Sequence, residues 1–249
     1  LSVIINVIII AIFAVIIIVP FVGEWPYRIT FTFENFISVF QDNALLGVIK
    51  NSLVVAILTA LLGTLVVYGG ALVTARSNLG KGLKKTIESI ALITNTIPGM
   101  VLGIAYLLIF SGTPIQNTYL IIILCNIVHF FSSPYLMMKN ALVKMNGSFE
   151  TTAKLMGDNW LKTVTRIITP NALISLFEVF SYYFINAMVT VSAVIFIAGA
   201  RTMVMTTKIK ELQHFAKFNE IFVLSILILL INLIAKGVFK YIIKKKEGK

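Results

Sequence analysis

The sequence is poor in charged residues, in histidine and in cysteine. Charged residues make up 12% of the 249 positions, there are two histidines, and Cys125 is the single cysteine. Soluble domains carry about 25% charged residues, so this composition excludes an ordinary soluble domain. A single cysteine excludes a disulfide framework within the chain, and we expect Cys125 to be an unreactive thiol in an apolar stretch.

Motifs for nucleotide binding and hydrolysis are also absent from the sequence. A phosphate-binding P-loop needs the pattern G-x-x-x-x-G-K-[ST]. The nearest stretch, "SNLGKGLKK", has Ala75 where the first glycine belongs and Gly82 directly after the lysine. No set of Asp, Glu or His residues has the spacing of a metal or hydrolase site. We therefore expect neither an enzyme nor a cofactor in this chain.

Long apolar stretches dominate what is present. Hydrophobic residues make up 58% of the chain, and the mean hydropathy is +0.96. A transmembrane helix needs about 20 mostly apolar residues. The candidate spans are about 1–22, 46–75, 88–110, 118–138, 171–199 and 220–242. No polar linker divides them, so the sequence predicts one all-α domain, residues 1–249, with six transmembrane helices.

The start of the chain predicts a span rather than a secretory signal. The first 19 residues carry no charge, whereas a signal peptide begins with a basic segment. The sequence begins at Leu1 instead of Met, so we expect either a few missing residues or a segment of a longer protein.

Lysine and arginine are distributed unevenly between the loops. Loops on the cytoplasmic side of membrane proteins carry an excess of these residues. If six helices alternate, one side holds 14 basic residues, in 76–85, in 139–169 and in the C-terminal tail, and the other side holds six. This predicts that both termini are cytoplasmic. The net charge of +11 is then a topology signal and not a nucleic-acid surface, and the tail "KKKEGK" lies among anionic headgroups.

One outer segment, 200–220, departs from this bias with four basic and two acidic residues. One interpretation is that short cytoplasmic loops decide the topology and this segment is free to vary. The other is that a positive outer mouth favours an anionic cargo or an acidic docking surface.

The loop 139–169 predicts a short amphipathic helix followed by a turn. Phe149, Ala153, Met156 and Trp160 recur at the spacing of one helix face. We expect Ser148 to cap the helix start, Gly157 to end or bend it, and Pro170 to suit the first turn of the next span. Such an apolar stripe covers either the protein's own helix ends and the lipid interface, or a groove on a partner.

This loop resembles the signature loop of binding-protein-dependent ABC importer permeases. That motif reads Glu-Ala-Ala, three residues, Gly, nine residues, Ile, one residue, Leu-Pro. Aligned on the glycine, the matching positions are Ala153, Gly157, Ile167 and Pro170. Thr151 stands in place of the glutamate and Thr169 in place of the leucine. Glu150 lies one position earlier, which turns it by about 100° around a helix.

The resemblance covers about 45–240 and implies a type I ABC importer permease fold with a cytoplasmic coupling helix. In that family the helix docks on an ATPase, and nucleotide-driven closure switches the permease between inward-open and outward-open states. The implied coupling residues are Phe149, Glu150, Ala153, Met156, Gly157, Trp160, Ile167 and Pro170. The implied partners are an ATPase dimer that binds ATP and Mg, a second permease half (identical, homologous or fused) and an extracytoplasmic solute-binding protein. The implied location is the inner or plasma membrane of a prokaryote.

Polar residues inside the predicted spans mark candidate positions along a translocation pathway. Such residues are costly in lipid and usually face protein or water. The candidates are Asn126, His129, Glu178, Tyr182, Asn186, Thr190 and Ser192. Each also has a plain structural explanation: interhelical hydrogen bonding for His129, packing for Tyr182, and solvation or ion pairing for Glu178. Pro98, Gly99 and Gly103 are expected to loosen the third span, and Gly69, Gly70 and Ala71 to allow close helix contact.

Two stretches narrow the resemblance to a subgroup of these permeases. "TIPGMVLGIAYLLIF" (96–110) and "MVTVSAVIFI" (188–197) resemble permeases for ferric iron and 2-aminoethylphosphonate, with polyamine, sulfate and thiamine permeases as wider relatives. The cargo implied is a small polar solute or ion. Two alternatives stay open at this point: a secondary transporter or channel that works without ATP, which would show broken helices or charged pairs at mid-membrane, and a membrane scaffold with no pathway.

Overall fold

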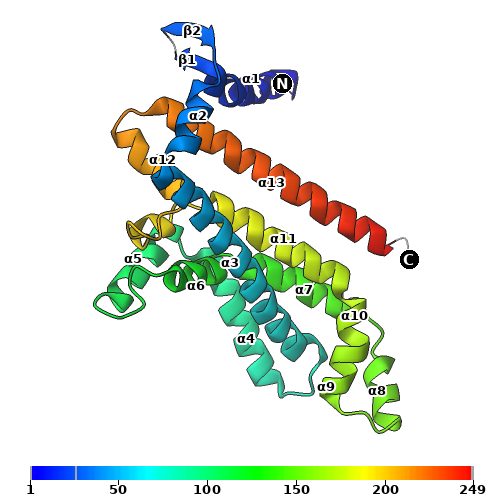
Figure 1. Cartoon of the computed structure of the whole chain (residues 1–249). Coiled ribbons are helices and arrows are strands. Elements are labelled where there is room, and N and C mark those ends of the chain that lie inside the picture. The colour runs from blue at the N-terminus through cyan, green and yellow to red at the C-terminus, as the bar shows by residue number, and fades with distance from the viewer. Residues whose placement is uncertain (1, 26, 248–249) are drawn as a thin grey trace.

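The computed structural model describes residues 2–25 and 27–247 and is almost entirely helical (Figure 1). The exception is a small antiparallel hairpin of β1 (Val22–Glu24) and β2 (Arg28–Phe31), in which Val22 pairs with Phe31. The long helices are α1 (Ser2–Ile18), α3 (Asn43–Arg76), α4 (Lys81–Ile93), α5 (Gly99–Phe110), α6 (Tyr119–His129), α7 (Ser132–Lys144), α11 (Leu173–Val189), α12 (Met205–His214) and α13 (Phe218–Glu247). The short ones are α2 (Glu34–Gln41), α8 (Ser148–Leu155), α9 (Trp160–Thr163) and α10 (Thr169–Asn171), with single turns η1 (Val19–Phe21), η2 (Thr94–Thr96), η3 (Val164–Ile168) and η4 (Val194–Phe196).

The six expected spans correspond to three continuous helices and three bent pairs. The continuous ones are Ser2–Phe21, Asn43–Arg76 and Phe218–Lys246. The bent pairs are Lys81–Thr96 with Gly99–Phe110 at 108°, Tyr119–His129 with Ser132–Lys144 at 59°, and Trp160–Asn171 with Leu173–Val189 at 74°. By length and composition these helices account for up to six membrane crossings.

The breaks change three of the expected spans. In the third, Ile97 and Pro98 are extended, because the residue before a proline avoids the helical region, and the chain turns sharply before α5. In the fourth, the break falls at Phe130 and Phe131; Pro134 lies in the first turn of α7, where a proline is tolerated. The fifth helix ends at Val189 and not at 199, as Thr190 becomes extended.

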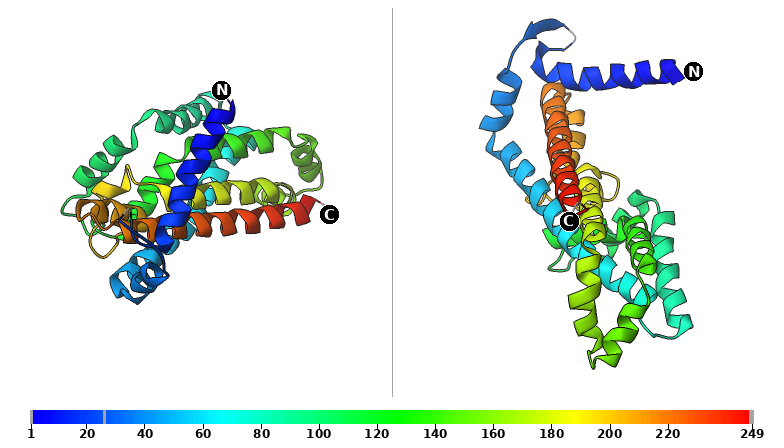
Figure 2. Two further views of the ribbon diagram at one scale, coloured as in Figure 1. Left: turned by 90° about the horizontal axis from the view of Figure 1, so that it is seen from above. Right: turned by 90° about the vertical axis from the view of Figure 1, so that its right-hand side faces the viewer.

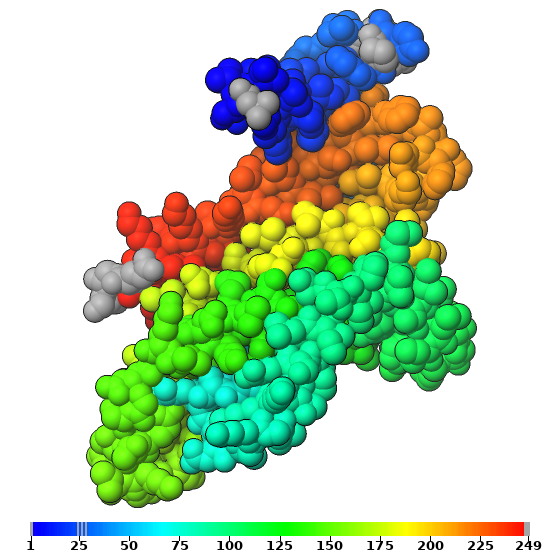
Figure 3. All heavy atoms as spheres, turned by 180° about the vertical axis from the view of Figure 1, so that it is seen from behind, coloured from blue at the N-terminus to red at the C-terminus, as the bar shows by residue number. Residues whose placement is uncertain are grey.

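The long helix α3 lies at the centre of the core. It packs along α11 and also against α7 and α6, and Figure 3 shows α13, α11 and α7 as neighbouring layers. The closest approach to α11 is at Gly63, where an added Cβ would lie 2.9 Å from ring atoms of the fully buried Tyr183. Of the expected small-residue positions, Gly69 has no heavy atom within 4 Å of such a Cβ, whereas a Cβ at Gly70 would lie 3.9 Å from Phe131 and Tyr135 ring atoms and Ala71 is fully buried.

Helix α1 makes little contact with the bundle. It extends sideways at the hairpin end of the molecule (Figure 2), and none of its residues 2–18 is buried. The short α2 and the hairpin lie at the same end, with Phe21 packed against Phe31, Phe33 and Phe36 at ring-centroid distances of 5.0–5.7 Å. The α8–α9 segment lies at the opposite end (Figure 1).

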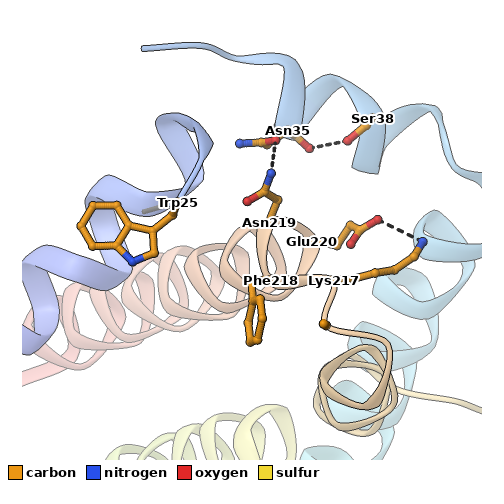
Figure 4. Close-up of a pocket in the computed structure, with 8 residues that line it drawn as sticks. Trp25, Asn35, Ser38, Lys217, Phe218, Asn219 and Glu220 are labelled. Atoms are coloured by element: carbon orange, nitrogen blue, oxygen red, sulfur yellow. Dashed lines mark hydrogen bonds and ion pairs between the residues drawn. The ribbon is translucent and has the colours of Figure 1, made fainter. Parts of the chain in front are cut away.

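Two asparagines fasten the hairpin to α13 (Figure 4). Asn35 Nδ2 donates to the carbonyl oxygens of Pro20, at 3.1 Å, and Val22, at 2.7 Å. Asn219 Nδ2 donates to the Gly23 carbonyl, at 2.9 Å, and to Asn35 Oδ1, at 3.1 Å. A pocket of about 320 Å³ lies beside this clamp, lined by Trp25, Asn35, Ser38, Ala216, Lys217, Phe218, Asn219 and Glu220.

We predict that Gly63→Val destabilises the bundle, because its side chain would collide with the Tyr183 ring. Overpacking of this kind costs about 1–3 kcal/mol, which should appear as a lower melting temperature of the detergent-purified protein. Gly69→Val is the matched control, since it puts the same residue on the same helix in open space. An equal loss in both variants would show that the effect does not come from the contact with Tyr183.

Candidate functional site

The end of the molecule opposite the hairpin carries two short helices joined by a tight turn. Helix α8 stops at Leu155 because Gly157 takes a left-handed backbone with φ +77°. The Gly157 N–H donates to the Lys154 carbonyl and the Asp158 N–H to the Ala153 carbonyl, which is the paired bonding of a Schellman motif. Asn159 then caps α9 by accepting from the Lys162 N–H at 2.8 Å. The expected role of Gly157 as the helix end is confirmed.

The start of α8 differs from the expectation. Ser148 is the first helical residue and does not cap; Gly147 occupies the cap position without a side-chain hydrogen bond. The Ser148 N–H instead donates to Asn146 Oδ1 at 2.9 Å. An asparagine two positions upstream satisfies one of the free donors of the first turn, which is the usual alternative to a serine cap.

The expected stripe does not lie on one helix face, because the turn at Gly157 intervenes. Phe149 and Ala153 share a face of α8, where Ala153 is buried, while Trp160 begins α9. Met156, 78% exposed, forms an exposed apolar surface with residues on either side of the turn. This surface, called the apolar tip below, consists of Leu155, Met156, Trp160 and Leu161. The sequence reasoning missed Leu155 and Leu161, although both lie within four residues of the glycine.

A buried arginine connects α8 to the end of α3. Arg76 Nε lies 2.6 Å from Glu150 Oε1, and its Nη2 donates to Glu150 Oε2 at 2.9 Å. The same guanidinium donates to the carbonyl oxygens of Met145 and Asn146, each at 3.0 Å. Two adjoining pockets of about 460 and 230 Å³ flank this ion pair and share Arg76, Asn78, Glu150 and Lys154 as lining residues.

The remaining motif residues lie where the chain enters α11. Ile167 is half-buried in the π-helical turn η3, and Pro170 occupies the first turn of α10. Thr169 Oγ1 donates to the Val164 carbonyl at 2.9 Å and lies 2.7 Å from the Tyr68 hydroxyl of α3. The segment after the apolar tip is therefore tied to α3 as well.

Five of the seven candidate pathway residues form two groups. His129 of α6 and Ser192 of the segment after α11 meet around Gly99, where an added Cβ would lie 2.3 Å from Ser192 Oγ and 3.1 Å from His129 Cε1. Glu178, Tyr182 and Asn186 share α11, with Glu178 exposed and the Asn186 amide donating to the Tyr182 carbonyl at 2.7 Å. No hydrogen bond between described residues joins the two groups.

Two further candidates are buried. The Thr190 carbonyl accepts from Thr206 Oγ1 at 2.7 Å, so Thr190 helps to hold α12. Asn126 is 0% exposed, and within the described part of the chain neither atom of its side-chain amide has a hydrogen-bond partner. Groups of three or more His, Cys, Asp or Glu arranged to hold a metal ion do not occur among residues 2–25 and 27–247.

Comparison with known proteins agrees with this arrangement. Residues 67–248 match the family described as "Binding-protein-dependent transport system inner membrane component". The ferric transport system permease protein FbpB of Actinobacillus pleuropneumoniae is 29% identical over 198 residues, which cover 76% of this chain and 28% of that protein. The chain thus spans less than a third of this relative's length.

Solved structures show the same fold. A bacterial ABC transporter involved in the import of the acidic polysaccharide alginate superposes with a TM-score of 0.74 at 18% identity, covering 95% of this chain and 94% of that chain. A bacterial alginate ABC transporter in complex with an alginate pentasaccharide-bound periplasmic protein gives 0.71 at 19% identity, with coverages of 86% and 84%.

We predict that Asn126→Leu raises the melting temperature of the purified protein. An unpaired buried amide costs about 1–3 kcal/mol, and a leucine of similar volume removes that cost. Asn186→Leu is the control: its amide already has a partner, so the substitution should bring no gain. A lower melting temperature for Asn126→Leu would mean that the amide is paired in the assembled protein and would favour its role in the pathway.

Proposed function

The chain belongs to the family of inner membrane components of binding-protein-dependent transport systems, and from this premise we propose how it couples to its motor and what it carries. As a member of this family it is a multi-pass inner membrane permease component of an ABC importer. It is non-catalytic and holds no cofactor of its own. Its cargo, its partners and its site residues are the subject of the proposal.

Helix α8 and the apolar tip form the docking surface for the ATPase. The observation that carries this assignment is the exposure of Leu155, at 85%, Met156, at 78%, and Leu161, at 64%, around a turn at the end of the molecule opposite the hairpin. Three large apolar side chains in solvent at the end of a membrane protein favour a protein partner over open water. The motif matches at Ala153, Gly157, Ile167 and Pro170 point to the same segment.

This end of the molecule is cytoplasmic in our proposal, and so are both termini. The excess of lysine and arginine in 76–85, 139–169 and the C-terminal tail supports this orientation. The hairpin end then faces the extracytoplasmic binding protein. The basic residues of 200–220 are partly neutralised within the chain, because Lys208 pairs with Glu211 and Lys217 with Glu220. This pairing supports the interpretation that the segment is free of topological constraint.

The cargo proposed is a small polar solute or ion, with ferric iron or 2-aminoethylphosphonate as the first candidates. A ferric permease at 29% identity supports iron, and the stretches 96–110 and 188–197 support both. His129 and Ser192, which meet at the break around Gly99, and the polar side of α11 line half of the pathway. A second permease half completes it.

Transport proceeds by alternating access. ATP binding closes the ATPase dimer, which moves α8 and opens the bundle toward the loaded binding protein; hydrolysis resets it. The three bent helix pairs would also suit an ATP-independent transporter. Family membership favours the ABC importer, because members of that family work with a separate ATPase.

We predict that an ATPase subunit co-purifies with the protein from native membranes and that Met156→Glu with Trp160→Glu releases it. Charges on the apolar tip would have to be desolvated on docking, which costs several kcal/mol per ion. Mass spectrometry of the bound subunits is the measurement. Tyr27→Glu, an exposed aromatic on the hairpin, is the control and should leave the ATPase bound. A wild-type protein that purifies alone and transports without ATP would overturn the proposal.

We predict that Gly157→Val abolishes uptake while the protein still inserts in the membrane. A β-branched residue in a left-handed backbone costs roughly 1–2 kcal/mol, so the turn rearranges and the apolar tip is misplaced. Gly157→Asn, which tolerates that backbone, should retain most activity. Gly147→Val is a second control, because Gly147 has φ −71° and open space around it. Normal uptake and ATPase association in Gly157→Val would contradict the role of the turn.

A further inference from the structure

The guanidinium of Arg76 sits at the junction of three helices. Arg76 is the last residue of α3, Met145 and Asn146 follow the end of α7, and Glu150 lies in the first turn of α8. Four contacts of 2.6–3.0 Å radiate from this one side chain, which is 6% exposed. Its donors therefore hold two backbone carbonyls and a carboxylate in one fixed arrangement.

The ion pair between Arg76 and Glu150 is of the strong kind. Its arrangement is bidentate: Nη2 donates a hydrogen bond to Oε2, and Nε makes a 2.6 Å ion-pair contact with Oε1 that lacks hydrogen-bond geometry. The pair also lies largely out of solvent. Glu150 also lies at the positive end of α8, which favours a carboxylate there. Removing one partner of such a pair leaves a buried charge without compensation, so the pair resists being pulled apart.

This pair is also the polar link between α8 and the membrane spans. Among the described residues, the hydrogen bonds and ion pairs of α8 otherwise stay within the segment 146–158. The covalent route from α8 to α11 runs through the Gly157 turn, the π-helical turn η3 and a 74° bend, each of which can absorb a displacement. Arg76, in contrast, is continuous with 34 residues of α3 without a break.

We propose that Arg76 is the positioning residue through which a movement of α8 is delivered to α3. A displacement of Glu150 moves the base of α3, and because α3 packs on α11, α7 and α6, the displacement reaches the centre of the bundle. This inference rests on the proposed function, in which an ATPase moves α8. It differs in assigning the transmission to one side chain of another span, 74 positions away from Glu150 in the sequence.

The test uses the whole importer, with its ATPase and binding protein, in lipid nanodiscs. Spin labels at the exposed Leu65 of α3 and Leu108 of α5, in a Cys125→Ser background, report a distance with and without ATP and vanadate. We expect the wild type to show a nucleotide-dependent shift in this distance. In Glu150→Gln and in Arg76→Lys, which keep side-chain length or charge but lose the bidentate pair, we expect the shift to fall about tenfold. ATPase retention should stay at the wild-type level in Arg76→Lys, because Arg76 belongs to α3 and lies outside the proposed docking surface.

Two further variants serve as controls. Glu88→Gln breaks the ion pair between Glu88 of α4 and Lys139 of α7, away from α8, and should leave the shift unchanged. Arg76→Glu combined with Glu150→Arg restores opposite charges, and it should regain at least about half of the shift that Arg76→Glu alone abolishes. Recovery in the double variant attributes the effect to the pair and not to folding of either side chain alone.

The outcomes separate the inference from its premise. A wild-type protein that binds no ATPase overturns the proposed function and the inference with it. Wild-type binding and a normal shift in Glu150→Gln overturn the inference alone. Loss of the ATPase from Arg76→Lys also overturns it, since the pair would then shape the docking surface and not transmit its movement.

Discussion

The structure depends on the requirement that every backbone donor and acceptor inside a membrane has a partner. Three of its spans are broken or bent, and each break releases such groups. The continuous helix α3 supplies hydrogen-bond partners to backbone groups of non-helical segments from polar side chains along its length. Near its start, Asn51 Nδ2 donates to the carbonyls of Arg201 and Met203, and Ser52 Oγ accepts from the Met205 N–H. These bonds hold the non-helical segment that follows α11.

The same helix repeats this role toward its other end. The Tyr68 hydroxyl is hydrogen-bonded to Thr169 Oγ1 beside the bend before α11. The Arg76 guanidinium donates hydrogen bonds to the carbonyl oxygens of Met145 and Asn146, which follow α7. Thr74 accepts from the Tyr135 hydroxyl at 2.9 Å, which fixes α7 itself. A continuous helix that holds several irregular segments is well suited to conduct a displacement, since these partners are bonded directly to it. The role of α3 in packing and the role in transmission that we propose for it therefore have the same origin.

Much of the fold could be predicted from the sequence, because long apolar stretches and basic loops are local signals. The break at Pro98 was also within reach, since a proline restricts the residue before it. The break at Phe130 and Phe131 was missed, although Pro134 marks it: a proline cannot donate to the carbonyl four positions earlier, that of Phe130, and its ring clashes with that carbonyl in a continuous helix. The predicted stripe failed for a different reason. Gly157 was taken as a helix end while the helix period was counted across it, and both cannot hold.

Glu150 lies one position before the place where the motif has its glutamate, and this shift changes what its side chain contacts. Thr151, at the position of the motif's glutamate, is exposed, while Glu150 turns inward by about 100° toward Arg76. A carboxylate committed to a buried arginine of its own chain has little capacity left for a partner's cation. In the docking that we propose, the energy then comes from the apolar tip. The polar anchoring that a surface glutamate would supply between two chains is instead placed within one, between α8 and the helix it moves.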